Sequence, residues 1–423
     1  KNKHRKKILG ENLKIKTTRF QKKFREFASV LRNEYRNIFC DAGVLLIAVG
    51  AIFIYSTAYS LAYKNEVLRD VPVAVVDNSR TPSSRQLIRS FDATPNVDVV
   101  YKPASLDEAK KLFLERKVNG IIVIPGDYEK KLMRTEKVNL AIYADASYFL
   151  MYRQVFFDIM GSIGHSNSNV EWLRFVSKGV SSKQAEALSN PVSISVRNMY
   201  NPYLGYATFI MPAILMVIIQ QTLLIGIGMV GGTWREKCLY KTLIPSGERR
   251  MSVLPIVLGK SAAFISVYCI TLSYLLCFHY KLFGYPMNGS AGTIVLFLLP
   301  YLLSCTFLGV ALSSLFRHRE NSLLLLLFTS IPVLMLSGAS VPQECIPQWL
   351  YYGTKFIPSG SGVDGFIRIQ TMGATLAEVS TQFWTLWILT AVYFLLACLG
   401  MRRVLRKTER EERLKQLTAQ LES

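Results

Sequence analysis

The sequence predicts an all-α membrane protein with six transmembrane helices and an extracytoplasmic α/β (α+β) domain inserted between the first two. Three observations predict this fold: six charge-free runs, a soluble-looking stretch after the first run, and a net charge of +21 that is unevenly distributed. The runs are Ala42–Tyr63, Asn198–Trp234, Ser261–His279, Leu282–Phe316, Asn321–Gln343 and Val379–Met401. Each is long enough for about 20 helical residues to cross about 30 Å of hydrocarbon. A soluble core with six such uncharged helices would be exceptional.

The basic residues define the expected topology. Residues 1–43, 232–252, 316–320 and 402–423 carry +16 of the net charge, and all four segments fall on one side if the six spans alternate. The positive-inside rule therefore places both termini in the cytoplasm. We read the excess as topology plus attraction to anionic membrane lipids, not as a nucleic-acid site.

The chain before the first span divides into two parts. Residues 1–18 are basic and polar and predict a disordered tail. Residues 19–41 predict an amphipathic helix in the membrane interface, or alternatively one packed on a protein partner. Its aromatic and aliphatic residues recur every three or four positions, at Phe20, Phe24, Phe27, Leu31, Tyr35 and Ile38.

The first span, residues 42–63, lies too far from the N-terminus for a cleaved signal peptide. Residues 64–203 then alternate apolar strands with amphipathic helices, which predicts an α/β layer domain outside the membrane. The expected strands are Val71–Val76, Val97–Tyr101, Ile121–Ile124, Leu140–Tyr143 and Pro191–Arg197. The expected helices are Ser83–Phe91, Leu106–Arg116, Asp127–Met133 and 148–188, the last broken near Gly161–Asn169.

Residues 204–401 hold spans two to six, and residues 402–423 form a cytoplasmic tail. The outer segment 341–378 is too long and too apolar for a simple turn. It predicts short helices that re-enter the outer leaflet, which is tolerated where protein or water satisfies the backbone.

Chemical motifs of an enzyme are absent from the sequence. Gly259-Lys260-Ser261 ends like a phosphate-binding loop, but Leu254 stands where that loop needs its first glycine. The spans have almost no carboxylates, which disfavours ion-driven transport. We expect no catalytic residue, bound cofactor or metal. Two amides near the middle of a span, Gln220 and Gln221, either hydrogen-bond between helices or line a substrate path.

The loop after the second span is the distinctive segment. Arg235-Glu236-Lys237 leads into an amphipathic stretch with Leu239 and Leu243 that ends at Pro245. A membrane protein driven by an external ATPase needs a rigid projection of this kind to receive force. An ordinary solvated loop is the alternative.

At these residues the chain resembles the permease subunit of ABC-2 type transporters with a large extracytoplasmic domain. Stretches in the family's order and spacing carry the resemblance: Val73–Asp77, Ser83-Ser84-Arg85, Glu108-Ala109, Val118–Pro125 with Asp127-Tyr128, Tyr200-Asn201-Pro202, Leu336-Ser337-Gly338 with Pro342, and Phe356, Pro358, Asp364-Gly365 and Arg368. The coupling loop departs from the family, because Cys238, Tyr240 and Lys241 replace the usual Glu, Gly and Thr.

The resemblance implies a bacterial inner-membrane exporter subunit whose ATP and magnesium are bound by separate cytoplasmic ABC ATPase subunits. It also implies a second permease copy or a paralogue, and it makes a periplasmic adaptor and an outer-membrane channel candidate partners. Arg235, Glu236, Lys237, Leu239 and Leu243 are then the ATPase-coupling residues. Gln220, Gln221, Tyr55 and Tyr59 would line the substrate path, and Trp349, Phe356, Pro358 and Phe366 the exit gate. The rival interpretation is a non-transporting receptor or envelope-assembly scaffold anchored in the membrane.

Overall fold

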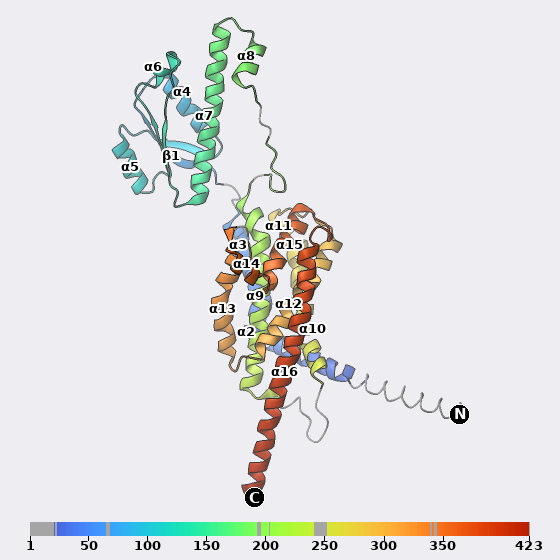
Figure 1. Ribbon diagram of the computed structural model, residues 1–423. Helices are drawn as coiled ribbons and strands as arrows, with labels where there is room; N and C mark the ends of the chain where they lie inside the picture. The colour runs from blue at the N-terminus through green and yellow to red at the C-terminus, as the bar shows by residue number, and fades with distance from the viewer. Residues whose placement is uncertain are drawn as a thin grey trace, which may run out of the picture. The chain divides into compact units, whose positions relative to one another are not determined.

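The computed structural model describes residues 21, 23–64, 68–192, 196–202, 204–240, 252–338, 341 and 345–422. The chain forms two compact units (Figure 1). The α/β unit comprises Asn65–Asn198. The helical unit comprises Lys1–Lys64 together with Met199–Ser423.

The α/β unit is built on a four-stranded sheet with the order β2-β1-β3-β4. The strands are β1 (Val71–Asp77), β2 (Val97–Tyr101), β3 (Gly120–Ile124) and β4 (Ala141–Ala144). β1 pairs in parallel with β2 and β3, and β4 closes the sheet antiparallel to β3. The apolar runs predicted these four strands to within one residue at each end. The predicted strand Pro191–Arg197 lies partly outside the described residues, and its described residues are not in a strand.

Helices cover both faces of this sheet. On one face, α4 (Pro82–Asp92), α6 (Tyr128–Met133) and α7 (Phe149–Ser177) pack on alternate β1 residues. On the other, α5 (Leu106–Leu114) places Ala109 against the intervening β1 residues Ala74 and Val76. The alternation follows from the two-residue repeat of a strand. The Ser105 hydroxyl caps α5 by accepting from the Glu108 N–H at 3.2 Å.

The long helix after the sheet differs from the prediction. α7 runs unbroken through Gly161 and Gly164, and the chain turns instead at Gly179, where φ is +84°. α8 (Ser182–Ser189) follows. The predicted break was wrong because helix glycines cost only about 1 kcal/mol each, which burial of Val155 and Ile159 on this helix offsets. Gly179 adopts the left-handed conformation that other residues avoid.

Within the described residues of the helical unit, six helices are long and apolar enough to cross a membrane, by length and composition. The first is formed by α2 (Ala42–Leu45), a π-helical turn at Leu46–Gly50, and α3 (Ala51–Ala62). The third joins α10 (Val253–Tyr274), a π-helical turn at Leu275–His279, and α11 (Tyr280–Phe283). The others are α9 (Tyr206–Glu236), α12 (Ala291–Ser313), α13 (Arg319–Leu336) and α16 (Ser380–Glu422).

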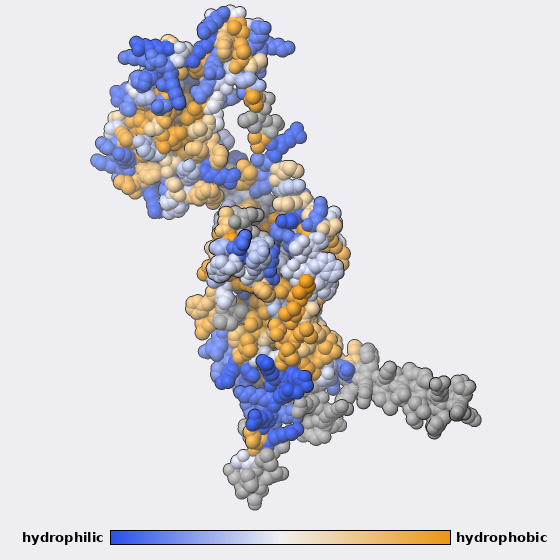
Figure 2. Space-filling view, viewed as in Figure 1, coloured by the Kyte–Doolittle hydropathy of each residue, from blue (hydrophilic) through white to orange (hydrophobic). Residues whose placement is uncertain are grey.

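α9 forms the core of this unit. In the apolar, membrane-length stretch of α9, 94% is buried inside the unit. The corresponding shares are 6% for α13 and 28% for the first span. Figure 2 shows apolar side chains on the visible face of the helical unit, and hydrophilic side chains at the end from which α16 extends. We call the end of the unit where α9 ends at Glu236, α13 begins at Arg319 and Gly400 of α16 approaches Ser314 the basic end.

The segment before α16, where short helices were expected, contains two helices among its described residues. α14 (Gln348–Thr354) is followed by α15 (Pro358–Met372), which is largely buried against α9, α12 and α16. Glycines allow this close packing, since a Cβ at Gly362 would overlap the Tyr301 ring of α12 and one at Gly365 would overlap Phe297.

Residues 23–40 form the helix that precedes the first span. Its buried stripe is Val30, Glu34 and Ile38, whereas Phe24 and Phe39 are more than half exposed. The predicted aromatic stripe is therefore divided between the helical unit and the exposed surface, and Phe20 lies outside the described residues. The helix packs tightly on α10, because Gly259 lacks a Cβ that would approach Val30 to 2.9 Å.

Candidate functional site

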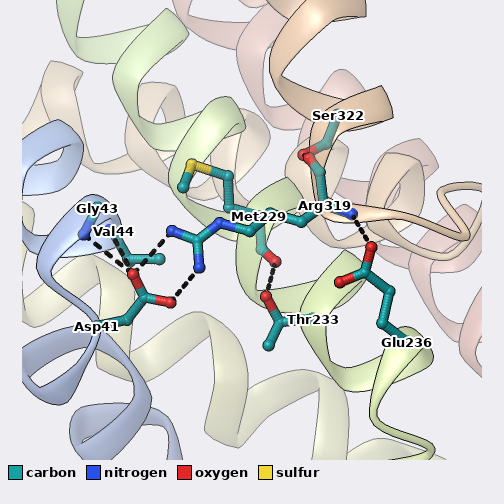
Figure 3. Close-up of polar contacts among 8 residues, drawn as sticks. All are labelled: Asp41, Gly43, Val44, Met229, Thr233, Glu236, Arg319 and Ser322. Carbon is teal, nitrogen blue, oxygen red and sulfur yellow. Dashed lines mark hydrogen bonds and ion pairs between the residues drawn. The ribbon is translucent and has the colours of Figure 1, made fainter.

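An ion pair at the basic end joins the first and fifth spans. The Arg319 guanidinium, at the start of α13, donates two hydrogen bonds to Asp41, of 2.5 Å to Oδ2 and 2.8 Å to Oδ1 (Figure 3). Asp41 is the N-cap of α2 and also accepts from the N–H groups of Gly43 and Val44. The Arg319 hydrogen bond holds the pKa of the Asp41 carboxyl below its ordinary value, because it stabilises the carboxylate. Asp41 is therefore ionised at neutral pH.

The predicted coupling residues contact the connection between α12 and α13. Glu236 Oε1 accepts from the Arg319 backbone N–H at 3.1 Å and lies 3.3 Å from His318 Nδ1. Arg235 Nη1 donates to the Phe316 carbonyl at 3.4 Å. The Glu236 carboxylate thus satisfies an N–H at the beginning of α13 and complements the helix dipole there. Figure 3 shows Glu236 and Asp41 bound to opposite ends of Arg319.

The remaining coupling residues differ in exposure. Lys237 is exposed and Leu239 is partly buried. Both line a cavity of about 420 Å³ with Asn37, Trp234 and residues of the first span. Leu243 lies outside the described residues, as does most of the amphipathic stretch predicted around it.

A buried ion pair joins the first helix to α10. Lys260 Nζ donates to Glu34 Oε1, and the two side chains are 5% and 1% exposed. The Lys260 Nζ also lies 4.6 Å from the centroid of the Trp234 ring and 5.9 Å from that of Tyr240. These rings belong to the end of α9 and to the loop after it, so one ammonium group connects three segments of the basic end. Cation–π contacts of this geometry are attractive.

The ion pair between Lys260 and Glu34 was not predicted from the sequence. Gly259-Lys260-Ser261 was set aside as a failed phosphate loop, whereas Gly259 provides a close approach for the first helix and Lys260 supplies the charge that Glu34 needs. Two signals were available in the sequence: a lysine near the start of an apolar helix, and a glutamate three residues after Leu31 and four before Ile38 of the predicted apolar stripe. A charge on an apolar stripe requires a partner.

Of the predicted path residues, Gln220 is fully buried and its side chain hydrogen-bonds α9 to α15. Its Oε1 accepts from the Ser359 N–H at 2.8 Å, and its Nε2 donates to Ser359 Oγ at 3.3 Å. Ser359 is the second residue of α15, so Gln220 caps that helix from the middle of α9. This is the interhelical role, which was one of the two alternatives.

The other path residues lie elsewhere. Both polar atoms of Gln221 are buried without a hydrogen-bond partner among the described residues. Tyr55 and Tyr59 are 49% and 37% exposed on the first span. In the single chain the two tyrosines are therefore exposed, whereas the two glutamines are buried.

The predicted exit-gate residues differ in exposure. Trp349 and Phe356 are 76% and 72% exposed, whereas Phe366 is 3% exposed inside α15. Pro358 is the first residue of α15, a position that tolerates its missing N–H. The Tyr393 hydroxyl of α16 donates to the Phe356 carbonyl, which fixes the turn before α15. In the part of the chain that the structure describes, no group of three or more His, Cys, Asp or Glu could hold a metal ion.

Among the described residues, six helices of membrane-spanning length and composition, joined by polar contacts at one end, are the fold of a multi-pass membrane protein. The chain belongs to the ABC-2 family of transporter proteins, whose sequence model matches residues 42–399. The recognition made from the sequence motifs is therefore confirmed.

Two relatives from Escherichia coli strain K12 are similar over nearly their whole length. The "Probable multidrug ABC transporter permease YbhR" is 22% identical over 373 residues, which cover 87% of this chain and 96% of the relative. The "Inner membrane transport permease YhhJ" is 22% identical over 383 residues, which cover 88% and 96%. The protein is thus a membrane transporter subunit.

Proposed function

We propose that the chain is the permease subunit of an ATP-driven exporter that moves a hydrophobic or amphipathic substrate, such as a drug, lipid or peptide-like molecule, out of the cytoplasm or inner membrane. The observation that carries the proposal is the linked set of polar contacts at the basic end. Family membership and the transport names of both relatives support it. ATP and magnesium would be bound by a separate ATPase subunit.

The contacts suggest how force would travel. A push on residues 235–239 would pass through Glu236 to the start of α13 and through Arg319 to Asp41 on the first span. The Lys260 ammonium would keep the first helix and α10 moving with the end of α9. Because Gln220 couples α9 to α15, displacement of α9 would reach the far end of the helical unit. Alternating access would be the result.

The expected topology places the basic end in the cytoplasm and the α/β unit outside it, in the inner membrane of a bacterium. The charge distribution supports this orientation. The exposed apolar faces of α13 and of the first span would meet lipid or a second permease, identical or paralogous. A periplasmic adaptor and an outer-membrane channel would be partners of the α/β unit.

Reconstitution with an ATPase tests the proposal. The chain and an ABC ATPase from the same genome are purified together in lipid nanodiscs, and ATP hydrolysis is measured with and without the chain. We expect stimulation by the chain, and loss of most of it in Lys237→Glu, which reverses an exposed charge in the coupling loop. Lys281→Glu is the matched control. Lys281 is also exposed, but it lies in α11 at the end of the third span, whereas the coupling loop precedes the start of that span.

Two results would contradict the coupling model. One is the failure of every ABC ATPase of the genome to bind the chain. The other is equal stimulation by the Lys237→Glu variant, the Lys281→Glu variant and the unchanged chain.

A further inference from the structure

The α/β unit contains a large cavity that the transport proposal does not use. It lies among α4, α6 and α7, on one face of the sheet, and has a volume of about 850 Å³. Pockets for small organic molecules have volumes of roughly 300–1,000 Å³. Its lining runs along α7 from Gly161 to Arg174, a distance of about 20 Å at 1.5 Å per residue. The space suits an elongated small molecule.

The lining of the cavity contains both apolar and polar side chains. Leu87, Leu132, Val170 and Leu173 are among the apolar ones. Hydroxyl groups lie beside them on the same helices, including those of Ser90, Ser162 and Ser166. Ser162 Oγ donates to Ser90 Oγ at 3.0 Å, and Ser90 Oγ donates in turn to the Leu87 carbonyl at 2.7 Å. An amphipathic molecule matches such a lining.

The charge of the lining favours an anion. Arg174 is the only formally charged side chain among the described residues that line the cavity, and His165 is the only histidine. Glu129 accepts from Ser83 Oγ at 2.7 Å beside the cavity but is not part of its lining. Arg174 Nη2 donates to the Leu132 carbonyl at 2.5 Å, and a guanidinium carries five N–H donors in all. It can therefore keep its hydrogen bond to α6 and still bind an acid group.

We propose that this cavity binds an amphipathic organic anion, with its acid group at Arg174 and its apolar body along Leu132, Val170 and Leu87 toward Gly161. The observation that carries the proposal is a cavity of ligand size with one cation at its end and no carboxylate in its described lining. The site lies entirely within the α/β unit. Binding there does not depend on ATPase coupling, so it can succeed or fail separately from the transport proposal.

The chain offers a matched pair of positions for the test. Gly161 and Gly164 are both exposed in α7, and a Cβ at either would meet no atom within 4 Å. Gly161 lines the cavity and Gly164 does not. Gly161→Phe should therefore place a ring in the Gly161 end of the cavity, while Gly164→Phe changes helix propensity in the same way but leaves the space open. Arg174→Gln removes the charge, and Arg153→Gln is its control at an exposed position of the same helix outside the lining.

The probe is a dodecanoate that carries a photoreactive diazirine, added to the full chain in lipid nanodiscs. Labelled peptides are identified by mass spectrometry, which separates cavity labelling from probe dissolved in lipid. We expect saturable labelling of peptides from α4, α6 and α7, competed by unlabelled decanoate. Gly161→Phe and Arg174→Gln should each weaken it about tenfold or more, since charge-assisted hydrogen bonds are the strong ones. Their controls should label like the unchanged chain.

Defined outcomes would overturn the proposal. Unsaturable labelling, or labelling confined to the membrane-spanning helices, would exclude the site. Equal labelling of the two glycine variants would show that the cavity is not where the probe binds. Equal binding of a dodecanol analogue by the unchanged chain would show that the cavity does not select an anion, which contradicts the proposal. Thermal unfolding of each variant beside its control identifies any loss of folding.

Discussion

Loss of one partner of the buried ion pair should be more damaging than loss of both. Lys260→Met would leave the Glu34 carboxylate, whose side chain is 1% exposed, without its cation. Breaking a buried pair in this way costs about 3–5 kcal/mol of unfolding free energy, because a buried charge remains uncompensated. The lost contact of Lys260 with the Trp234 ring adds about 0.5–2 kcal/mol. The expected destabilisation is therefore at least about 3 kcal/mol.

The double variant Lys260→Met, Glu34→Leu should recover most of this loss. Both charges are then absent, and apolar side chains of similar volume replace them, which is often neutral or stabilising for buried pairs. The interaction energy of the double-mutant cycle should be large, since the two residues are in direct contact. Recovery of stability in the double variant is expected only if the ion pair is buried as the structure describes it.

Unfolding of the full chain in mixed micelles, titrated with a denaturing detergent and followed by tryptophan fluorescence, measures these differences. Lys237→Met is the control, because substitution of an exposed side chain changes stability by about 0.5 kcal/mol or less. A single variant within 1 kcal/mol of the unchanged chain would refute the argument. So would a double variant as unstable as the single one, because the Glu34 charge would then not be the cause.

Three further predictions concern other contacts. Gln220→Leu should destabilise the chain by about 1–3 kcal/mol in the same unfolding assay, since it leaves the Ser359 N–H buried without an acceptor; an unchanged midpoint would contradict the capping role. Asp41→Asn should lower the melting temperature at pH 6, and this difference should begin to shrink as the pH falls below about 3.9 and vanish only below the lowered folded-state pKa. The reason is that a carboxyl whose pKa is lowered in the folded state stabilises the fold above its unfolded-state pKa. This stabilisation is lost as the pH falls through the folded-state pKa. A stability difference that grows as the pH is lowered would be evidence against the ion pair. Gly362→Ala should cost about 1–3 kcal/mol, because its Cβ overlaps the Tyr301 ring; full stability would show that α15 can move away from α12.

Much of the fold was predictable because it rests on local periodicity. Strand β2 and the apolar cores of β1 and β3 were read from short runs bounded by Asn, Gly or Pro, and they fell where the structure has them. Six helices of bilayer length were likewise evident. The break expected near Gly161 was wrong because a glycine weakens a helix only slightly, and packing of the face that carries Val155 and Ile159 decided the outcome.

The candidate site was less predictable because its contacts join distant parts of the chain. Glu236 was singled out as a charge in a loop, but its role at the beginning of α13 depends on the position of Arg319, 83 residues later. Glu34 and Lys260 are separated by 226 positions. A helix pattern shows which face a charge occupies and does not show which residue faces it.

The sequence by itself determined what this protein is: the uncharged lengths of its helices, the alternating insert after the first of them, and the family motifs that the comparisons confirm. Tertiary structure alone decided that α9 is the buried core, that Gln220 caps α15, and that Lys260 neutralises Glu34. The physical reason is that propensity and hydropathy are properties of neighbouring residues. A buried polar group, in contrast, is stabilised only by the particular partner that packing brings within hydrogen-bonding distance.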